Sequence, residues 1–126
     1  MRQVKMSFGK VVIHAELLET PTADAVWAAL PLESRVATWG EEVYFLVPLS
    51  METEPDARDV VEAGEIAFRP VGGAVIIGFG ATPVSHGDEI RLAAPANVFA
   101  RTTDDVHALK QVEPGTLVVV EAVVQG

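Results

Sequence analysis

The side chains best suited to move a proton or hold a metal are scattered through this sequence. Its three histidines, His14, His86 and His107, lie in unrelated segments. His86 and Asp88 flank a glycine and could supply two ligands to a cation, but a turn of this composition forms without one. Zinc sites that are recognisable from sequence carry paired ligands at fixed spacing, and no such pair occurs. Because the chain also has no cysteine, we predict no metal and no cofactor.

Two pairs of adjacent carboxylates, Glu41-Glu42 and Asp104-Asp105, are the next candidates for acid–base chemistry. Neighbouring residues of a strand point to opposite faces, so the glutamates could not act together there. Aspartates at the start of a helix suit the helix dipole without any further role. Both pairs are therefore predicted to be solvated.

Nucleophilic and phosphate-binding motifs are absent as well. The sequence has no G-x-S-x-G elbow around a serine. The glycines at 72–73 and 78–80 lack the spacing of a phosphate-binding fingerprint, and no lysine follows them as a P-loop requires. We interpret them as turn and barrel-corner residues. Without a complete catalytic constellation, the sequence leaves open whether the protein is an enzyme.

Large side chains on predicted strands remain as the possible lining of a site. Most of the aromatic residues must fill the core, because the chain has few others to do so. One or two of them beside Arg35 or Arg69 would make a shallow pocket. The predicted ligand-binding residues are Arg35, Trp39, Tyr44, Phe68 and Phe79.

The elements that must position these residues begin with a hairpin. Residues 4–8 alternate between apolar and polar, Gly9-Lys10 suits a type II′ turn, and residues 11–17 continue as the partner strand. Thr20-Pro21 then marks the start of a helix, with a cap followed by a proline in the first turn. An apolar stripe runs along this helix to Pro31, which ends it, at Ala23, Val26, Trp27 and Leu30.

The rest of the chain is predicted to form short strands with turns between them. Residues 50–58 have the composition of an exposed loop, and residues 104–110 that of a short helix capped by Thr103. Residues 116–124 are predicted to be the longest strand and to close the sheet near the N-terminal hairpin. The other predicted strands are 33–39, 42–47, 65–68, 74–79, 89–92 and 97–102. About eight strands and one or two helices favour a single mainly β barrel domain over residues 1–126.

Composition limits the partners. The formal net charge is −9, with nine basic against 18 acidic residues, which argues against nucleic-acid binding and against an anionic membrane surface. This charge either keeps the protein soluble or forms an acidic face for a cationic ligand. No apolar run approaches the roughly 20 residues that cross a bilayer, and no signal-peptide core is present, so a cytoplasmic location is expected.

The strand region contains four motifs in a fixed order: Trp39–Phe45 (WGEEVYF), Gly64–Phe68 (GEIAF), Phe79–Ser85 (FGATPVS) and Asn97–Arg101 (NVFAR). Together they resemble a family of small bacterial and archaeal proteins with a cyclophilin-like fold. The resemblance implies a closed eight-stranded β-barrel. One difference from the family is Arg69, which stands where its members commonly carry an aromatic residue.

The same resemblance implies little about activity. Cyclophilins are peptidyl-prolyl cis–trans isomerases that use an arginine, in a Phe-His-Arg context, beside an apolar groove, and this chain lacks that context. In this chain, Arg35 falls in the early strand and Phe79 in the inner strand that are comparable to those of cyclophilins. The first hypothesis is therefore a domain that binds a small molecule or an extended peptide in a groove, without a recognisable catalytic apparatus. The alternatives are an atypical prolyl isomerase and an assembly role through a sheet edge or the acidic loop, with the oligomeric state left open.

Overall fold

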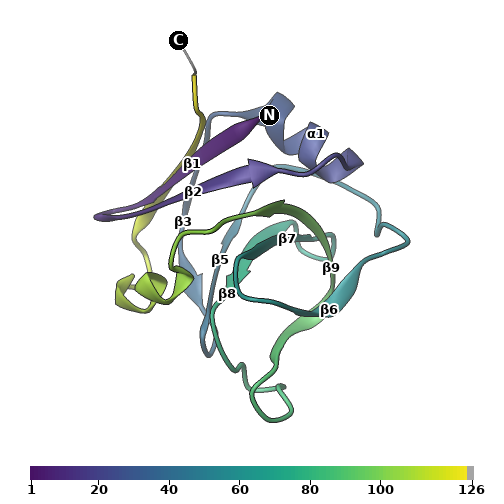
Figure 1. Cartoon of the computed structure of the whole chain (residues 1–126), viewed down its shortest axis with the longest axis vertical. Helices are drawn as coiled ribbons and strands as arrows, with labels where there is room; N and C mark the ends of the chain where they lie inside the picture. Colours follow the sequence, from purple (N-terminus) through teal and green to yellow (C-terminus); the bar gives the residue numbers. More distant parts are fainter. Residues whose placement is uncertain (125–126) are drawn as a thin grey trace.

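The computed structural model describes residues 1–124, and antiparallel strands are its main elements (Figure 1). A short α-helix, α1 (Pro21–Ala29), and a 3₁₀ helix, η1 (Val106–Gln111), accompany them. Neither of these helices has the length and apolar character needed to cross a membrane. The strands are β1 (Gln3–Phe8), β2 (Val11–Leu17), β3 (Leu32–Arg35), β4 (Ala37–Thr38), β5 (Glu42–Leu46), β6 (Arg58–Val61), β7 (Glu65–Arg69), β8 (Ala74–Gly78), β9 (Ile90–Arg101) and β10 (Leu117–Ala122).

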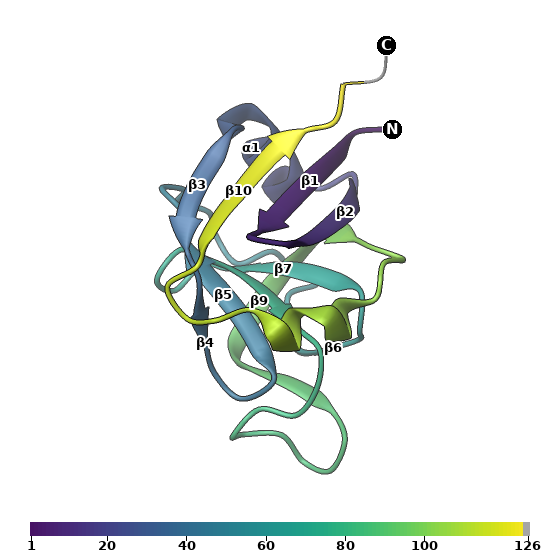
Figure 2. The same ribbon diagram turned by 90° about the vertical axis from the view of Figure 1, so that its left-hand side faces the viewer.

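Nine of these strands follow one another around a nearly closed barrel in the order β3-β10-β1-β2-β9-β7-β8-β5-β4. The first and last of them are halves of one stretch, because only Val36 separates β3 from β4. This stretch pairs with β10 before Val36 and with β5 after it. Figure 2 shows β3, β10 and β1 side by side. Counted as one bent strand, Leu32–Thr38 leaves eight members in the ring, so the predicted eight-stranded barrel is confirmed.

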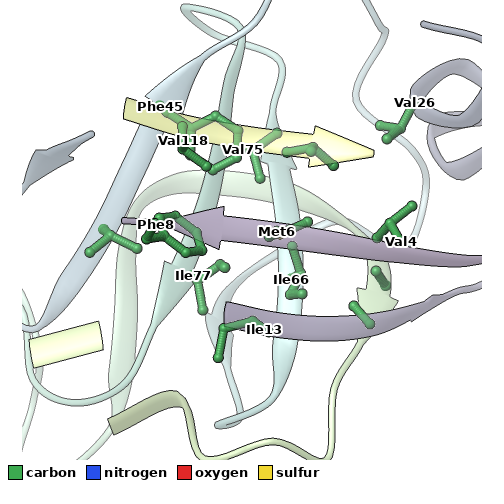
Figure 3. Packing of buried hydrophobic residues seen from close by; sticks show 14 of the residues in the cluster. Val4, Met6, Phe8, Ile13, Val26, Phe45, Ile66, Val75, Ile77 and Val118 are labelled. Atoms are coloured by element: carbon green, nitrogen blue, oxygen red, sulfur yellow. The ribbon is translucent and has the colours of Figure 1, made fainter. Parts of the chain in front are cut away.

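The main core fills the interior of this barrel. Alternate residues of β1 point inward, and Phe8 meets Phe45 edge to face with their ring centroids 6.1 Å apart (Figure 3). Helix α1 contributes Ala23 and Val26 to the same core. Each buried aliphatic or aromatic side chain adds about 1.5–3 kcal/mol to folding, so this cluster is the principal source of stability.

A second, smaller apolar cluster covers the outer face of β7 and β8. Ile66 and Phe68 of β7 point into the barrel, whereas Ala67 between them points outward. Strand β6 and the first half of β9 lie over this outer face. Leu92 and Ala96 of β9 belong to the cluster, together with Val61, Ala67, Ala74 and Ile76. Part of the sheet is therefore buried on both sides, which explains why all five residues of β8 are buried.

The two predictions that rest on local signals are confirmed. The hairpin forms as expected, with Gly9 at a φ of +64° in its turn. Thr20 caps α1, where its Oγ1 accepts a hydrogen bond from the N–H of Ala23 at 3.0 Å, and Pro21 is the first residue of the helix. Strand β10 pairs with β1, as predicted for the closing strand.

Strand β9 corrects the prediction of two short strands around Pro95. It runs unbroken for twelve residues and, rather than β10 with its six, is the longest strand. Its pairing with β6 shifts between Arg58↔Ala96 and Val60↔Arg91, so the positions near Pro95 lack a partner on β6. Pairing with β7 begins only at Asn97. Proline is tolerated here because no ladder hydrogen bond needs its missing N–H.

Two smaller differences concern the segments outside the barrel wall. The expected helix over 104–110 is the 3₁₀ helix η1, and Asp105 rather than Thr103 caps it, accepting a hydrogen bond from the N–H of His107. Strand β6 was not predicted, because its four residues show no clear alternation and pair irregularly.

The acidic loop that precedes β6 is fastened to the barrel by Asn97. The Asn97 side chain is fully buried and donates from Nδ2 to the carbonyl of Glu52 at 2.9 Å and to Oγ1 of Thr22 at 3.0 Å. Its Oδ1 accepts from the N–H of Glu54 at 2.9 Å. The loop is thus joined to β9 and to the first turn of α1 rather than free in solvent.

Candidate functional site

The most unusual side chain of the protein is the carboxyl group of Glu42. Along β5, Val43 and Phe45 point into the main core, so Glu42 and Tyr44 point to the outer face of the sheet. Only 2% of Glu42 is exposed, and the prediction of a solvated Glu41-Glu42 pair is therefore wrong for Glu42. Its neighbour Glu41 is exposed, as predicted.

The burial of Glu42 follows from the way β9 crosses the sheet. Glu42 pairs with Gly78 of β8, and Ile90 at the start of β9 lies directly over this glycine. A Cβ atom at position 78 would stand 2.4 Å from Cγ2 of Ile90. Glycine at position 78 therefore allows Ile90 of β9 to approach the backbone of β8 closely, which is one of the roles expected for a glycine within a strand.

Glu42 lines a small cavity of about 190 Å³ on this outer face. Tyr44 lies two residues further along β5, and Trp39 stands just after β4, where its N–H donates to the carbonyl of Glu42 at 3.2 Å. Ala93 of β9 and Arg69 at the end of β7 complete the lining. We call this cavity the Glu42 pocket.

Arg69 brings a positive charge to the Glu42 pocket. Its guanidinium carbon lies 5.8 Å from the centre of the Tyr44 ring, within the range of a cation–π contact. Its Nε donates to the carbonyl of Val71 at 2.8 Å, which fixes the orientation of the planar group. The pocket therefore combines two aromatic side chains, one cation and one carboxyl group.

The protein compensates only in part for the burial of the Glu42 carboxyl group. Within residues 1–124, Oε1 of Glu42 has no hydrogen-bond partner. Burial raises the pKa of Glu42 from 4.5 to about 7, and the attraction of Arg69 opposes this only in part. A buried acceptor without a partner costs about 1–3 kcal/mol of stability, so the folded protein carries a destabilising group in this pocket.

The structure separates the five predicted ligand-binding residues. Trp39 and Tyr44 come together in the Glu42 pocket. Phe68 is 0% exposed inside the barrel, so it is a core residue. Phe79 is nearly buried and borders a different cavity of about 320 Å³, beside Leu109 and Val112 of the segment around η1. Glu42 borders this second cavity too.

Arg35 lies apart from these residues. It ends β3, is exposed, and donates from Nη1 to the carbonyl of Gly115 at 3.2 Å. It belongs to the lining of neither the Glu42 pocket nor the cavity next to Phe79. Arg35 and Phe79 therefore do not converge on one groove.

Other charged clusters have structural explanations. Glu65 is 6% exposed and pairs with Arg58 and Arg101, and the hydrogen bond from Arg58 is the main reason that its pKa is lowered. The three histidines are exposed, and within residues 1–124 no cluster of three or more acidic, histidine or cysteine side chains could hold a metal. The Glu42 pocket is therefore the best candidate site in the described part of the chain.

Comparison with known proteins identifies the family. The sequence model of the cyclophilin-like proteins matches residues 2–121. The chain belongs to the cyclophilin-like family. No curated protein matches it.

Two solved structures share the fold of this cyclophilin-like chain. One is the solution structure of a hypothetical protein from Archaeoglobus fulgidus, 36% identical, which aligns with 95% of this chain and 93% of its own length at a TM-score of 0.81. The other is McbB in complex with tryptophan, 14% identical, at a TM-score of 0.70. The alignment covers 94% of this chain but only 44% of McbB, and at this identity the similarity shows the fold alone.

Sequence reasoning missed Glu42 although one signal was present. The alternation of β5 places residue 42 on the same face as Tyr44, which was a predicted site residue. Arg69, which differs from the residue that the resemblance implies at its position, also lies in the pocket. The sequence did not show that β9 crosses over this face and excludes water from it.

Proposed function

We propose that this cyclophilin-like domain binds a small organic molecule in the Glu42 pocket. The observation that carries the proposal is the unpartnered Oε1 of a buried carboxyl group at the pocket wall. A ligand O–H or N–H group that displaces the side chain covering Oε1 would supply the missing donor, and it would recover the cost of the unsatisfied acceptor.

The rest of the lining favours a planar ligand. Trp39 and Tyr44 offer aromatic surface, and Arg69 offers a cation for an electron-rich or anionic part of the ligand. The volume of about 190 Å³ is below the range of about 300–1,000 Å³ that is common for drug-sized ligands. These features support a compact small molecule over an extended peptide, which needs a longer groove.

A fragment screen by thermal shift tests this proposal. Compounds with a planar ring and an N–H or O–H donor should raise the melting temperature of the wild type and of Glu41→Gln, which alters the exposed neighbouring carboxylate. The same compounds should lose their effect on Glu42→Met, which keeps an unbranched side chain but has no acceptor oxygen. Saturation at about 100 times the dissociation constant would add about 2.7 kcal/mol of stability. If no fragment stabilises the wild type, or if all stabilise Glu42→Met equally, the proposal is wrong.

An atypical prolyl isomerase is the second candidate, and the observation that favours it is Arg69 beside Tyr44. Isomerisation needs an apolar proline site and a group that weakens amide resonance, against a barrier of about 18–20 kcal/mol. A protease-coupled proline assay with Arg69→Met and Arg35→Ala tests this. Equal rates for the wild type, both variants and the blank would reject isomerase activity.

A further inference from the structure

We propose that the Glu42 pocket is a proton-transfer site, in which the Glu42 carboxylate removes a proton from a small planar carbon acid and Arg69 stabilises the resulting anion. This inference rests on the proposed binding of a small molecule in the same pocket and names the chemistry that follows from it. The substrate class is a flat, conjugated molecule with an acidic C–H bond, whose anion is delocalised over the ring system.

The Glu42 carboxyl group has an oxygen atom to which no protein group within residues 1–124 donates. A general base needs a free lone pair within about 2.6–3.2 Å of the atom that gives up the proton. In Glu42 no group in the described part of the chain donates to Oε1, but this atom is covered by protein, so a bound molecule reaches its lone pairs by displacing a side chain of the pocket wall. The 2% exposure of Glu42 removes most of the water that would otherwise weaken a carboxylate as a base.

Arg69 places a positive charge in the same pocket as the Glu42 carboxyl group. Proton removal leaves an anion, and a fixed cation at the site stabilises that charge as it forms. The Arg69 guanidinium lines the same pocket and is held by Tyr44 and by the carbonyl of Val71. The base and the stabilising cation come from different strands, β5 and β7, so a molecule between them can contact both.

A paired strand holds Glu42 in place. Glu42 and Tyr44 lie on β5, which pairs with β8 along its whole length and with β4 at Tyr44 and Val43. Catalytic groups on paired strands keep their geometry better than groups on loops. Ala93 keeps the opposite wall small, which leaves room for a flat ring next to the two aromatic side chains.

The acid–base properties of the pocket agree with this role. Burial raises the pKa of Glu42 to about 7, which suits a base that works near neutral pH. The groups that face it are Arg69 and Tyr44 in the pocket, while β9 contributes only Ala93. Around the second cavity, which Glu42 also borders, the charged groups are Glu41, Lys110 and Glu113.

A suitable probe is 5-nitrobenzisoxazole, whose ring opens when a base removes its C–H proton. The electron pair of the C–H bond completes a C≡N triple bond, the N–O bond breaks, and its pair leaves on the phenolate oxygen. Glu42 gains the proton and returns it to water, so no oxidant, reductant or second substrate is needed. The phenolate absorbs visible light, which allows a direct rate measurement.

The wild type and Glu41→Gln should open this ring faster than acetate buffer of equal carboxylate concentration. The Glu42→Gln variant should lose about 100-fold or more of this rate, because general base catalysis supplies about 10²–10⁴-fold. Arg69→Met should lower kcat with a smaller effect on KM. The wild-type rate should rise with pH and level off above about pH 7, following the pKa of Glu42.

Failure of this inference can be told apart from failure of the binding proposal. The unreactive compound 6-nitrobenzotriazole has similar size and an N–H donor but no N–O bond in its ring, and its binding is followed by NMR titration. Binding that depends on Glu42 without any ring opening overturns proton transfer and leaves the binding proposal intact. Absence of both binding and ring opening overturns proton transfer and also counts against binding of planar ligands.

Two further outcomes would overturn proton transfer by Glu42. One is ring opening at the same rate in Glu42→Gln and the wild type. The other is a pH profile with its inflection near the ordinary pKa of 4.5 rather than near 7. The profile is measured on the wild type alone, so it decides the question even if a variant does not fold.

Discussion

Replacing Glu42 with glutamine should make the stability of the protein less dependent on pH between about pH 4 and about pH 8. The pKa of Glu42 is 4.5 in its ordinary state and about 7 in the fold. At a pH between these two values, Glu42 is protonated in the folded protein but ionised in the unfolded chain. Protonated Glu42 therefore stabilises the fold fully below the unfolded pKa. This contribution is lost as pH rises through the folded pKa.

The size of the effect follows from the shift in pKa. A change of one pKa unit corresponds to about 1.4 kcal/mol, so the shift of Glu42 amounts to about 3 kcal/mol between about pH 4 and about pH 8. Glutamine cannot ionise, so the variant has no such loss. We expect Glu42→Gln to gain about 3 kcal/mol relative to the wild type over this interval.

Urea denaturation at a series of pH values measures this gain, with the fluorescence of Trp27 and Trp39 as the signal. The other titrating groups are shared by both proteins and cancel in the difference. Glu41→Gln changes an exposed carboxylate and should alter the free energy of unfolding by less than about 0.5 kcal/mol. A difference between Glu42→Gln and the wild type that stays constant with pH, or that shrinks as pH rises, would refute the assigned burial of the carboxyl group.

Three further substitutions test the packing around the pocket and the barrel. Gly78→Ala should cost about 1–3 kcal/mol in urea denaturation, because its Cβ would stand 2.4 Å from Ile90, and adding Ile90→Ala should recover part of this loss. Asn97→Ala should cost about 1–3 kcal/mol and speed the hydrogen exchange of the Glu54 N–H, which loses its acceptor; unchanged exchange would argue against the fastening of the loop. Phe68→Ala should cost about 3–5 kcal/mol in the same denaturation experiment, and a loss below about 1 kcal/mol would contradict its place in the core.

The features that sequence predicts well here depend on neighbours along the chain. The hairpin rests on alternation and a glycine turn, and α1 rests on Thr20, Pro21 and a terminating proline, all within a few residues. Barrel closure also followed from the pattern of short strands. These signals survive because tertiary packing reinforces them.

The features that sequence missed depend on distant segments. Glu42 is buried because β9, almost fifty positions later, crosses its face of the sheet, and no local pattern around residue 42 encodes this. The sequence could not assign Phe68 to the core rather than to a pocket. Strand β7 is buried on both faces, so its residues do not alternate between apolar and polar in a way that marks the core side. The unbroken course of β9 through Pro95 likewise depends on gaps in pairing that only the partner strands determine.

The position of β10 in the ring has a consequence for how the barrel is made. Val4 of β1 pairs with Ala122 of β10, and β10 also pairs with β3, so the wall between β1 and β3 is completed by a strand that is synthesised after them. Contacts of such sequence separation slow folding, because a long loop must close before they form. Until Leu117–Ala122 leaves the ribosome, β1 and β3 each present an unpaired strand edge, the type of surface that promotes aggregation. A nascent chain of this protein therefore depends on its last strand, and we expect chaperone contacts to persist until that strand has emerged.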